Sequence, residues 1–138
     1  MNVLIDTNII LDVIQKRQPF FDDANQIFQQ CIGNVHNGFV TAHSISDIFF
    51  ITRKSHSLED RKNVIKLFCN FFTIISEGKN DFISFLDNGD WNDLEDALQM
   101  TCAEKSNLDY IITRDKENGF KNSPVKTISP VDFLKISS

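Results

Sequence analysis

The sequence is poor in the residues that mark disordered, fibrous or disulfide-stabilised chains. It has 3 proline, 5 glycine and 3 cysteine residues among 138, and the cysteines have no CxxC spacing. Cys31, Cys69 and Cys102 lie in apolar or helical stretches, so we predict buried thiols in the core. The sequence has no apolar run long enough to span a membrane and does not open with a basic leader segment. We therefore expect a cytoplasmic protein with no membrane partner.

The sequence also has fewer positively charged residues than negatively charged ones. The 14 Lys and Arg residues stand against 19 Asp and Glu, which gives a formal net charge of −5. Proteins that hold nucleic acid on a broad basic surface rely on Lys and Arg at the phosphates, so this class is disfavoured. Nucleic acid itself is not excluded, because positive charge is concentrated in one stretch. We interpret that stretch first as a solvated helical face: Arg53, Lys54, Arg61, Lys62 and Lys66.

The residues that are present describe a packed globular chain. Apolar residues make up 41% of the sequence, which includes 13 phenylalanines. A chain of 138 residues is long enough for one three-layer core and too short for two. We therefore expect residues 1–138 to form a single domain.

Short apolar runs alternate with helical patterns along the chain. Val3–Ile5 is typical of a strand buried on both faces of a parallel sheet. The other predicted strands are Gly38–Ala42, Thr73–Ile75, Asp109–Thr113 and Val125–Ile128. The predicted helices run from a cap at Thr7 or Asn8 to residue 18, over Asp22–Ile32, from a cap at Ser44, and over Leu58–Phe72, Asp81–Leu86, Asn92–Asn107 and Val131–Ile136. This order predicts a three-layer α/β/α sandwich with a mainly parallel sheet of four to five strands.

Four acidic anchors fall where a predicted strand ends or a helix begins: Asp6, Asp47, Asp93 with Asp96, and Asp115. The carboxyl ends of parallel strands meet at one edge of a sheet, so these distant carboxylates can converge there. Converged carboxylates repel one another and need a cation, and oxygen ligands suit Mg²⁺ or Mn²⁺. Such ions bind phosphate groups and orient water for attack, which points to a phosphodiester substrate.

Each acid also has a purely structural explanation. Asp93 can cap its helix with Asp96 in the first turn, and Asp47 stands at the third helical position after a Ser44 cap. Asp115 can be an ordinary loop acid in an ion pair. Capping does not require all four anchors to lie at the same sheet edge, and this coincidence favours a shared site.

Four segments of the chain resemble the four motifs of PIN domains, in the family's order and spacing. They are Leu4–Asp12 (LIDTNIILD), Ser44–Asp47 (SISD), Asp93–Gln99 (DLEDALQ) and Tyr110–Asp115 (YIITRD). The resemblance implies a metal-dependent endoribonuclease that uses Mg²⁺ or Mn²⁺. It further implies a VapC-type toxin of a toxin–antitoxin pair, with RNA as substrate, a cognate antitoxin as partner and a homodimer as assembly.

The resemblance assigns the acidic site to four catalytic metal ligands and a candidate fifth ligand: Asp6, Asp47, Asp96, Asp115 and Asp93. It also implies that Thr7 or Asn8 supports the Asp6 carboxylate through hydrogen bonds. Many family members have Glu at the position of Asp47, so the shorter side chain favours metal contact through water. Water, rather than a side chain, is the expected nucleophile.

Other residues near the motifs are given weaker roles. Arg114 can approach a phosphate, although an ion-pairing role is favoured. The histidines show no metal-ligand spacing and are treated as incidental, although His43 lies near the predicted site. Three adjacent aromatic pairs, mostly core, can each offer one ring to a subunit or antitoxin contact: Phe20-Phe21, Phe49-Phe50 and Phe71-Phe72.

Two other protein classes fit part of the pattern. One is a PIN-like interaction or dimerisation module that has lost catalysis, against which the complete set of acids argues. The other is a phosphoacceptor receiver domain, which has a similar length, an acidic Mg²⁺ pocket and a parallel sheet. That fold needs paired acids after the first strand and an acceptor Asp after a middle strand. Here Thr7 and Asn8 follow Asp6, and Thr41 and Ala42 occupy the later position.

Overall fold

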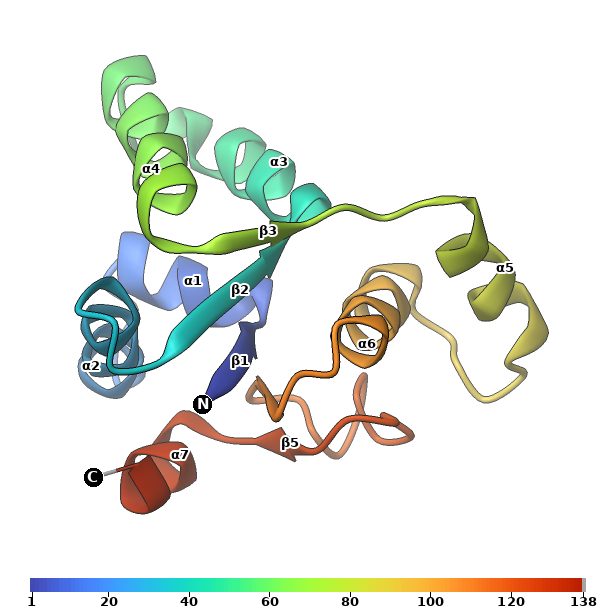
Figure 1. The fold of residues 1–138 in the computed structure, drawn as a ribbon. Coiled ribbons are helices and arrows are strands. Elements are labelled where there is room, and N and C mark those ends of the chain that lie inside the picture. Colours follow the sequence, from blue (N-terminus) through green and yellow to red (C-terminus); the bar gives the residue numbers. More distant parts are fainter. Residues whose placement is uncertain (138) are drawn as a thin grey trace.

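The fold is built on five parallel strands that lie side by side in one sheet (Figure 1). The computed structural model describes residues 1–137. The strands are β1 (Asn2–Ile5), β2 (Asn37–Thr41), β3 (Thr73–Ile75), β4 (Tyr110–Ile112) and β5 (Thr127–Ile128). Their order is β3-β2-β1-β4-β5, and every pairing is parallel.

Seven α-helices and one short 3₁₀ turn connect the strands in the described part of the chain. They are α1 (Thr7–Ile14), α2 (Phe21–Ile32), α3 (Ala42–Ile51), the 3₁₀ turn (Thr52–Lys54), α4 (Leu58–Phe71), α5 (Lys79–Asp87), α6 (Leu94–Lys105) and α7 (Pro130–Ser137). The predicted order of strands and helices and the α/β/α class are confirmed. Within residues 1–137, no helix has the length and apolar character needed to cross a membrane.

The sheet separates two hydrophobic cores, because successive side chains of a strand point to opposite faces. Val3 and Ile5 pack under α1, α2, α4 and α7 on one face. Leu4 and Ile111 pack under α6 on the other face. Figure 1 shows α5 and α6 on the opposite side of the sheet from α1 and α2. The central strand is therefore buried on both sides, which explains its continuous apolar sequence.

The strand order creates a switch point beside β1. The chain moves from β1 outward through β2 to β3 and then returns to place β4 on the other side of β1. Ligands of open parallel sheets bind in the crevice beyond the carboxyl ends of the strands at such a point. A receiver domain has the order 2-1-3-4-5, so the observed order argues against that alternative.

Two predicted helix caps are wrong. α1 begins at Thr7, so Asp6 is its N-cap residue instead of Thr7 or Asn8. α3 begins at Ala42, directly after β2, and the hydroxyl of Thr41 accepts the hydrogen bond from the Ser44 N–H group. Ser44 is consequently inside the helix and fully buried.

This shift of the cap changes the interpretation of Asp47. With α3 starting at Ala42, Asp47 is the sixth residue of the helix instead of the third. The helix dipole stabilises acids mainly within the first turn. Capping therefore does not explain the presence of an acid at this position.

The prediction of a buried thiol is confirmed for two cysteines and wrong for the third. Cys31 and Cys102 are buried, whereas Cys69 is exposed. Its neighbour Phe68 is the α4 residue that enters the core, where its ring contacts Phe28 with the centroids 5.9 Å apart. Adjacent residues of a helix point about 100° apart, so burial of Phe68 turns Cys69 toward solvent.

Gly38 provides a test of the packing between β2 and the helices. A Cβ atom at this position would lie 2.5 Å from the Phe72 ring and 3.0 Å from Cys31 Sγ. We expect Gly38→Ala to reduce the free energy of unfolding by about 1–3 kcal/mol, because overpacking forces neighbouring groups to move. Gly89→Ala is the matched control, since no atom lies within 4 Å of its Cβ position. Chemical denaturation would measure both, and equal stabilities would contradict the tight packing at Gly38.

Candidate functional site

Acidic residues from several segments converge at the carboxyl edge of the sheet. Asp6 follows β1, Asp115 lies in the loop after β4, and Glu95 and Asp96 lie in the first turn of α6. The charges of Asp115 and Glu95 act on Asp6, and those of Asp93, Asp6, Glu95 and Asp115 act on Asp96. The structure therefore brings together four of the predicted site residues, Asp6, Asp93, Asp96 and Asp115, and adds Glu95.

Asp6 is the most deeply buried member of this group, with 2% of its surface exposed. Its Oδ1 accepts a hydrogen bond from Gln99 Nε2 over 3.0 Å, and its Oδ2 accepts one from Thr113 Oγ1 over 2.9 Å. These donors come from α6 and from the residue that follows β4. Two elements distant in sequence therefore hold the carboxylate in one orientation.

The expected support of Asp6 by Thr7 or Asn8 is wrong. The Thr7 hydroxyl forms a buried hydrogen bond with the Ser44 hydroxyl over 2.6 Å, which joins α1 to α3. Asn8 is exposed. Thr7 and Asn8 are already the first two residues of α1, so the geometry of the helix sets the orientation of their side chains.

Gln99 is a site residue that the sequence analysis missed. It is fully buried in a helix whose neighbouring Leu98 and Met100 are buried and apolar. A buried carboxamide needs hydrogen-bond partners, and Gln99 stands three residues after Asp96, on the same helical face. A polar residue within an otherwise apolar stripe, beside a candidate acid, was the signal that could have identified it.

The environment of the two central acids disfavours negative charge. Burial raises the pKa of Asp6 to about 6, with smaller contributions from Asp115 and Glu95, although the bonds from Gln99 and Thr113 act in the opposite direction. Burial also raises the pKa of Asp96 to about 7, and the nearby carboxylates add to the shift. A positive ion placed among these groups would favour their ionised forms. The oxygen-only donor set fits a hard divalent cation.

Asp96 is held at the start of α6 by two neighbouring residues. Asp93 is the N-cap, and its Oδ1 accepts the hydrogen bond from the Asp96 N–H group over 2.9 Å, as the sequence predicts. Gly119, in the loop after β4, touches the Asp96 carboxylate so closely that an added Cβ would lie 1.9 Å from Oδ2. The Asp96 carboxylate therefore occupies the space that a side chain at position 119 would need.

Asp47 belongs to a second group at the same edge. Single ligand atoms of His43, Asp47 and Glu95 all lie within 4.8 Å of one another. His43 and Asp47 are four residues apart in α3 and so share a helical face. Burial raises the pKa of Asp47, and the charges that act on it are those of Glu95, His43 and Glu77. Glu95 links the two groups, because its charge also acts on Asp6 and Asp96.

His43 is enclosed by carboxylates. Its Nδ1 contacts the carboxylate of Glu77, which follows β3, and its Nε2 lies 3.8 Å from Glu95 Oε1. Burial alone would lower the pKa of His43, but the bonds and charges of Glu95 and Glu77 outweigh it and raise the pKa to about 9. The expectation that this histidine is incidental does not hold, because it contacts two carboxylates. Its spacing of four residues from Asp47, directly after a strand, was the signal of a shared face.

Arg114 is engaged in an ion pair. Its Nε and Nη2 donate to the two carboxylate oxygens of Asp12 over 3.0 and 3.2 Å. Its guanidinium also stacks on the Phe20 ring, with the central carbon 3.8 Å from the ring centroid. Asp12 is fully buried, so this pairing ties the end of β4 to α1. The predicted preference for ion pairing over phosphate contact agrees with this geometry.

The sequence of the chain is similar to that of a protein named as a ribonuclease. It is 25% identical over 140 residues to Ribonuclease VapC1 of Aquifex aeolicus (strain VF5), and the match covers 96% of this chain and 93% of that protein.

The fold is shared with several solved structures. VapBC2 from Rickettsia felis, bound to a DNA fragment from its promoter, has a TM-score of 0.69 at 17% identity and covers 94% of this chain and 98% of its own. VapC20 of Mycobacterium tuberculosis, described as a sarcin-ricin loop cleaving toxin, has a TM-score of 0.69 at 6% identity, with 88% and 95% covered. The PIN domain family model matches residues 2–117, a range that includes all four acidic segments. The chain therefore belongs to the PIN domain family.

Proposed function

We propose that this protein is a metal-dependent endoribonuclease that hydrolyses phosphodiester bonds of single-stranded or structured RNA. The observation that carries the proposal is the convergence of Asp6, Asp96 and Asp115 at one edge of the sheet. Burial, with a smaller contribution from the neighbouring carboxylates, raises the pKa values of Asp6 and Asp96 toward neutrality. A buried acidic cluster of this kind has a physical use when a cation enters it. The similarity to a protein named as a ribonuclease supports RNA as the substrate class.

In this proposal Asp6, Asp96 and Asp115 hold Mg²⁺ or Mn²⁺, with Asp93 as an additional ligand near the start of α6. The bound cation would lower the pKa of a water molecule and stabilise charge on the phosphate. The protein contributes orientation: Gln99 and Thr113 hold the Asp6 carboxylate through hydrogen bonds of 3.0 and 2.9 Å. No side chain is required as a nucleophile.

Asp47 is proposed to act on the metal through water. The charges that act on Asp47 come from Glu95, His43 and Glu77. Asp47 therefore belongs with His43 and Glu95, and not with the carboxylates around Asp6. The side chain of Asp is also one methylene shorter than that of Glu, which leaves room for a water molecule between carboxylate and cation.

We further propose that the protein is the toxin of a type II toxin–antitoxin pair, forms a homodimer and works in the cytoplasm as one domain. Structures of the same fold include a toxin–antitoxin complex from Klebsiella pneumoniae and VapBC-1 from nontypeable Haemophilus influenzae. Exposed aromatic rings offer contact surface for such partners: Phe50 is 61% exposed and Phe71 is 45% exposed. The same rings favour the alternative of a catalytically silent interaction module.

Replacement of one acid separates the nuclease from the interaction module. We expect Asp6→Asn to reduce RNA cleavage by roughly 100-fold or more, since losing a ligand should cost at least as much as losing a residue that orients one. Purified proteins would be incubated with mixed RNA in Mg²⁺, Mn²⁺ or EDTA, and discrete products would be separated by gel electrophoresis. Asp22→Asn, at an exposed position of α2, is the matched control and should cleave like the wild type. Equal cleavage by Asp6→Asn, or cleavage in EDTA, would refute the proposed site.

The raised pKa of Asp6 also predicts a dependence of stability on pH. The pKa is about 6 in the folded protein against the usual 3.8, so the folded state holds the proton more tightly. The resulting stabilisation is fully present below about pH 4 and is lost as pH rises through about 6. Metal-free wild type should therefore lose about 2 kcal/mol more than Asp6→Asn between pH 4.5 and pH 8.

Denaturant unfolding in EDTA at the two pH values measures this difference. His43, His36 and Asp96 also titrate with shifted pKa values. The histidines are present in both proteins and cancel in the comparison, whereas the Asp6 charge acts on Asp96, so the difference reports the titration of these two coupled acids. Adding Mg²⁺ at pH 8 should stabilise the wild type more than the variant. Parallel pH profiles of the two proteins would show that folding does not raise the pKa of Asp6.

A further inference from the structure

A cavity of about 510 Å³ opens beside the acidic site, between the turn that precedes α6 and the loop that follows β4. Asp93 and Gly119 line the cavity and also contact Asp96 of the acidic site. Asp93 lines the cavity and caps α6 through the Asp96 N–H group. Gly119 lines the cavity, and its Cα faces the Asp96 carboxylate closely enough that a Cβ would lie 1.9 Å from Oδ2. One wall of the cavity is therefore continuous with the proposed metal site.

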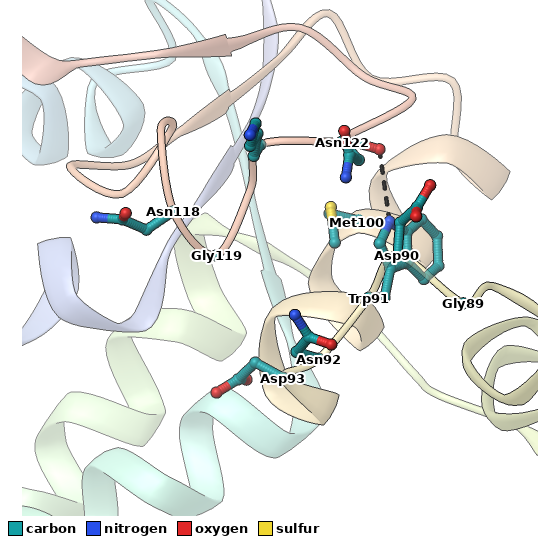
Figure 2. Close-up of a pocket in the computed structure, with 10 residues that line it drawn as sticks. Gly89, Asp90, Trp91, Asn92, Asp93, Met100, Asn118, Gly119 and Asn122 are labelled. Atoms are coloured by element: carbon teal, nitrogen blue, oxygen red, sulfur yellow. Dashed lines mark hydrogen bonds between the residues drawn. The ribbon is translucent and has the colours of Figure 1, made fainter.

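The lining combines one aromatic ring with polar side chains. Trp91 and Met100 supply the ring and a thioether, and three carboxamides and a cation come from Asn92, Asn118, Asn122 and Lys121. Figure 2 shows Asn92 and Asn122 on opposite sides of Met100, with the Trp91 ring beside them. Trp91 Nε1 donates to the carbonyl oxygen of Asn122 over 3.4 Å, the dashed line in Figure 2. This bond joins the turn to the loop and places the ring at the cavity.

We propose that the cavity binds one unstacked nucleotide of the RNA, next to the bond that is cut; this rests on the proposed function. A nucleobase has a flat face that stacks on an aromatic ring and an edge that carries hydrogen-bond donors and acceptors. Each carboxamide offers both a donor and an acceptor in one plane, which matches such an edge. The cavity volume lies in the range of small-molecule sites, about 300–1,000 Å³.

The charges around the cavity indicate which part of the nucleotide enters it. Asp90 and Asp93 also line the space, so its interior is unfavourable for a phosphate and favourable for the amino groups of a base. Lys121 is a cation on its wall and can contact the phosphate that joins the base to the chain. The base is therefore bound in the cavity, and its phosphate lies toward Lys121 and the Asp96 side.

This arrangement assigns a specificity role to residues outside the acidic cluster. The net charge of −5 disfavours a broad basic surface as the means of holding RNA. Stacking and edge contacts in one cavity provide binding that does not need such a surface. The nucleotide that fits the cavity would determine where the chain of RNA is cut.

Trp91 is the single tryptophan of the sequence and lies in the cavity wall, so its fluorescence reports binding there. The full-length Asp6→Asn variant would be titrated with each of the four nucleoside 5′-monophosphates and with short single-stranded oligoribonucleotides. We expect saturable quenching, with one base bound at least about fivefold more tightly than the weakest. Asn92→Ala should weaken binding about tenfold, whereas Asn80→Ala, at an exposed asparagine outside the cavity, should leave it unchanged.

Cleavage by the otherwise wild-type protein gives the second readout. Sequencing the product ends should show that Asn92→Ala and Lys121→Gln alter the base preference or rate, while Asn80→Ala and Lys126→Gln do not. Thermal unfolding of each variant identifies those that fail to fold, and Trp91→Phe tests the ring by a conservative change. Absence of quenching by every nucleotide and oligonucleotide, or quenching equally present in Asn92→Ala, would overturn the nucleotide pocket.

The two proposals fail in different ways. Nucleotide-dependent quenching without any cleavage by the wild type would support a nucleotide-binding cavity but refute the nuclease, and with it the placement of the nucleotide next to a bond that is cut. Metal-dependent cleavage that needs Asp6, with no response of Trp91 and an unchanged base preference in Asn92→Ala, would support the nuclease and refute the pocket.

Discussion

The burial of one carboxylate at the end of the central strand constrains the rest of the site. β1 is covered by helices on both faces, so Asp6, its next residue, is removed from water with 2% of its surface exposed. Such a group needs donors, and Gln99 and Thr113 supply them from α6 and from the end of β4. The positions of α6 and β4 relative to β1 are thereby coupled to the orientation of a single side chain.

Parallel pairing is what places the other acids around Asp6. Because all five strands run in one direction, their carboxyl ends share an edge, and the return of the chain from β3 to β4 opens a crevice beside β1. Two cores on opposite faces stabilise this arrangement, and neither contains the acids. The fold can therefore carry a costly concentration of charge at its edge while burial of apolar side chains stabilises the sheet.

The acidic edge has two parts with different chemistry. Around Asp6 and Asp96 the atoms that could bind a metal ion are carboxylate oxygens, and burial raises the pKa values of both residues toward neutrality. Around Asp47, an imidazole takes part, and the pKa of His43 rises to about 9 because Glu95 and Glu77 favour its charged form. Glu95 stands between them and is adjacent in sequence to Asp96. One part therefore lacks positive charge, while the other already contains it.

The sequence alone determined the order of strands and helices, the buried central strand, the Asp93 cap and the family, because these depend on local apolar periods and short motifs. It did not determine the partners of Asp6, since Gln99 and Thr113 are 93 and 107 residues away. The inclusion of His43, the cap at Thr41 and the cavity at Trp91 also came from tertiary structure. Helix starts depend on which hydroxyl reaches which N–H group, and clusters depend on strand order, neither of which a local pattern encodes.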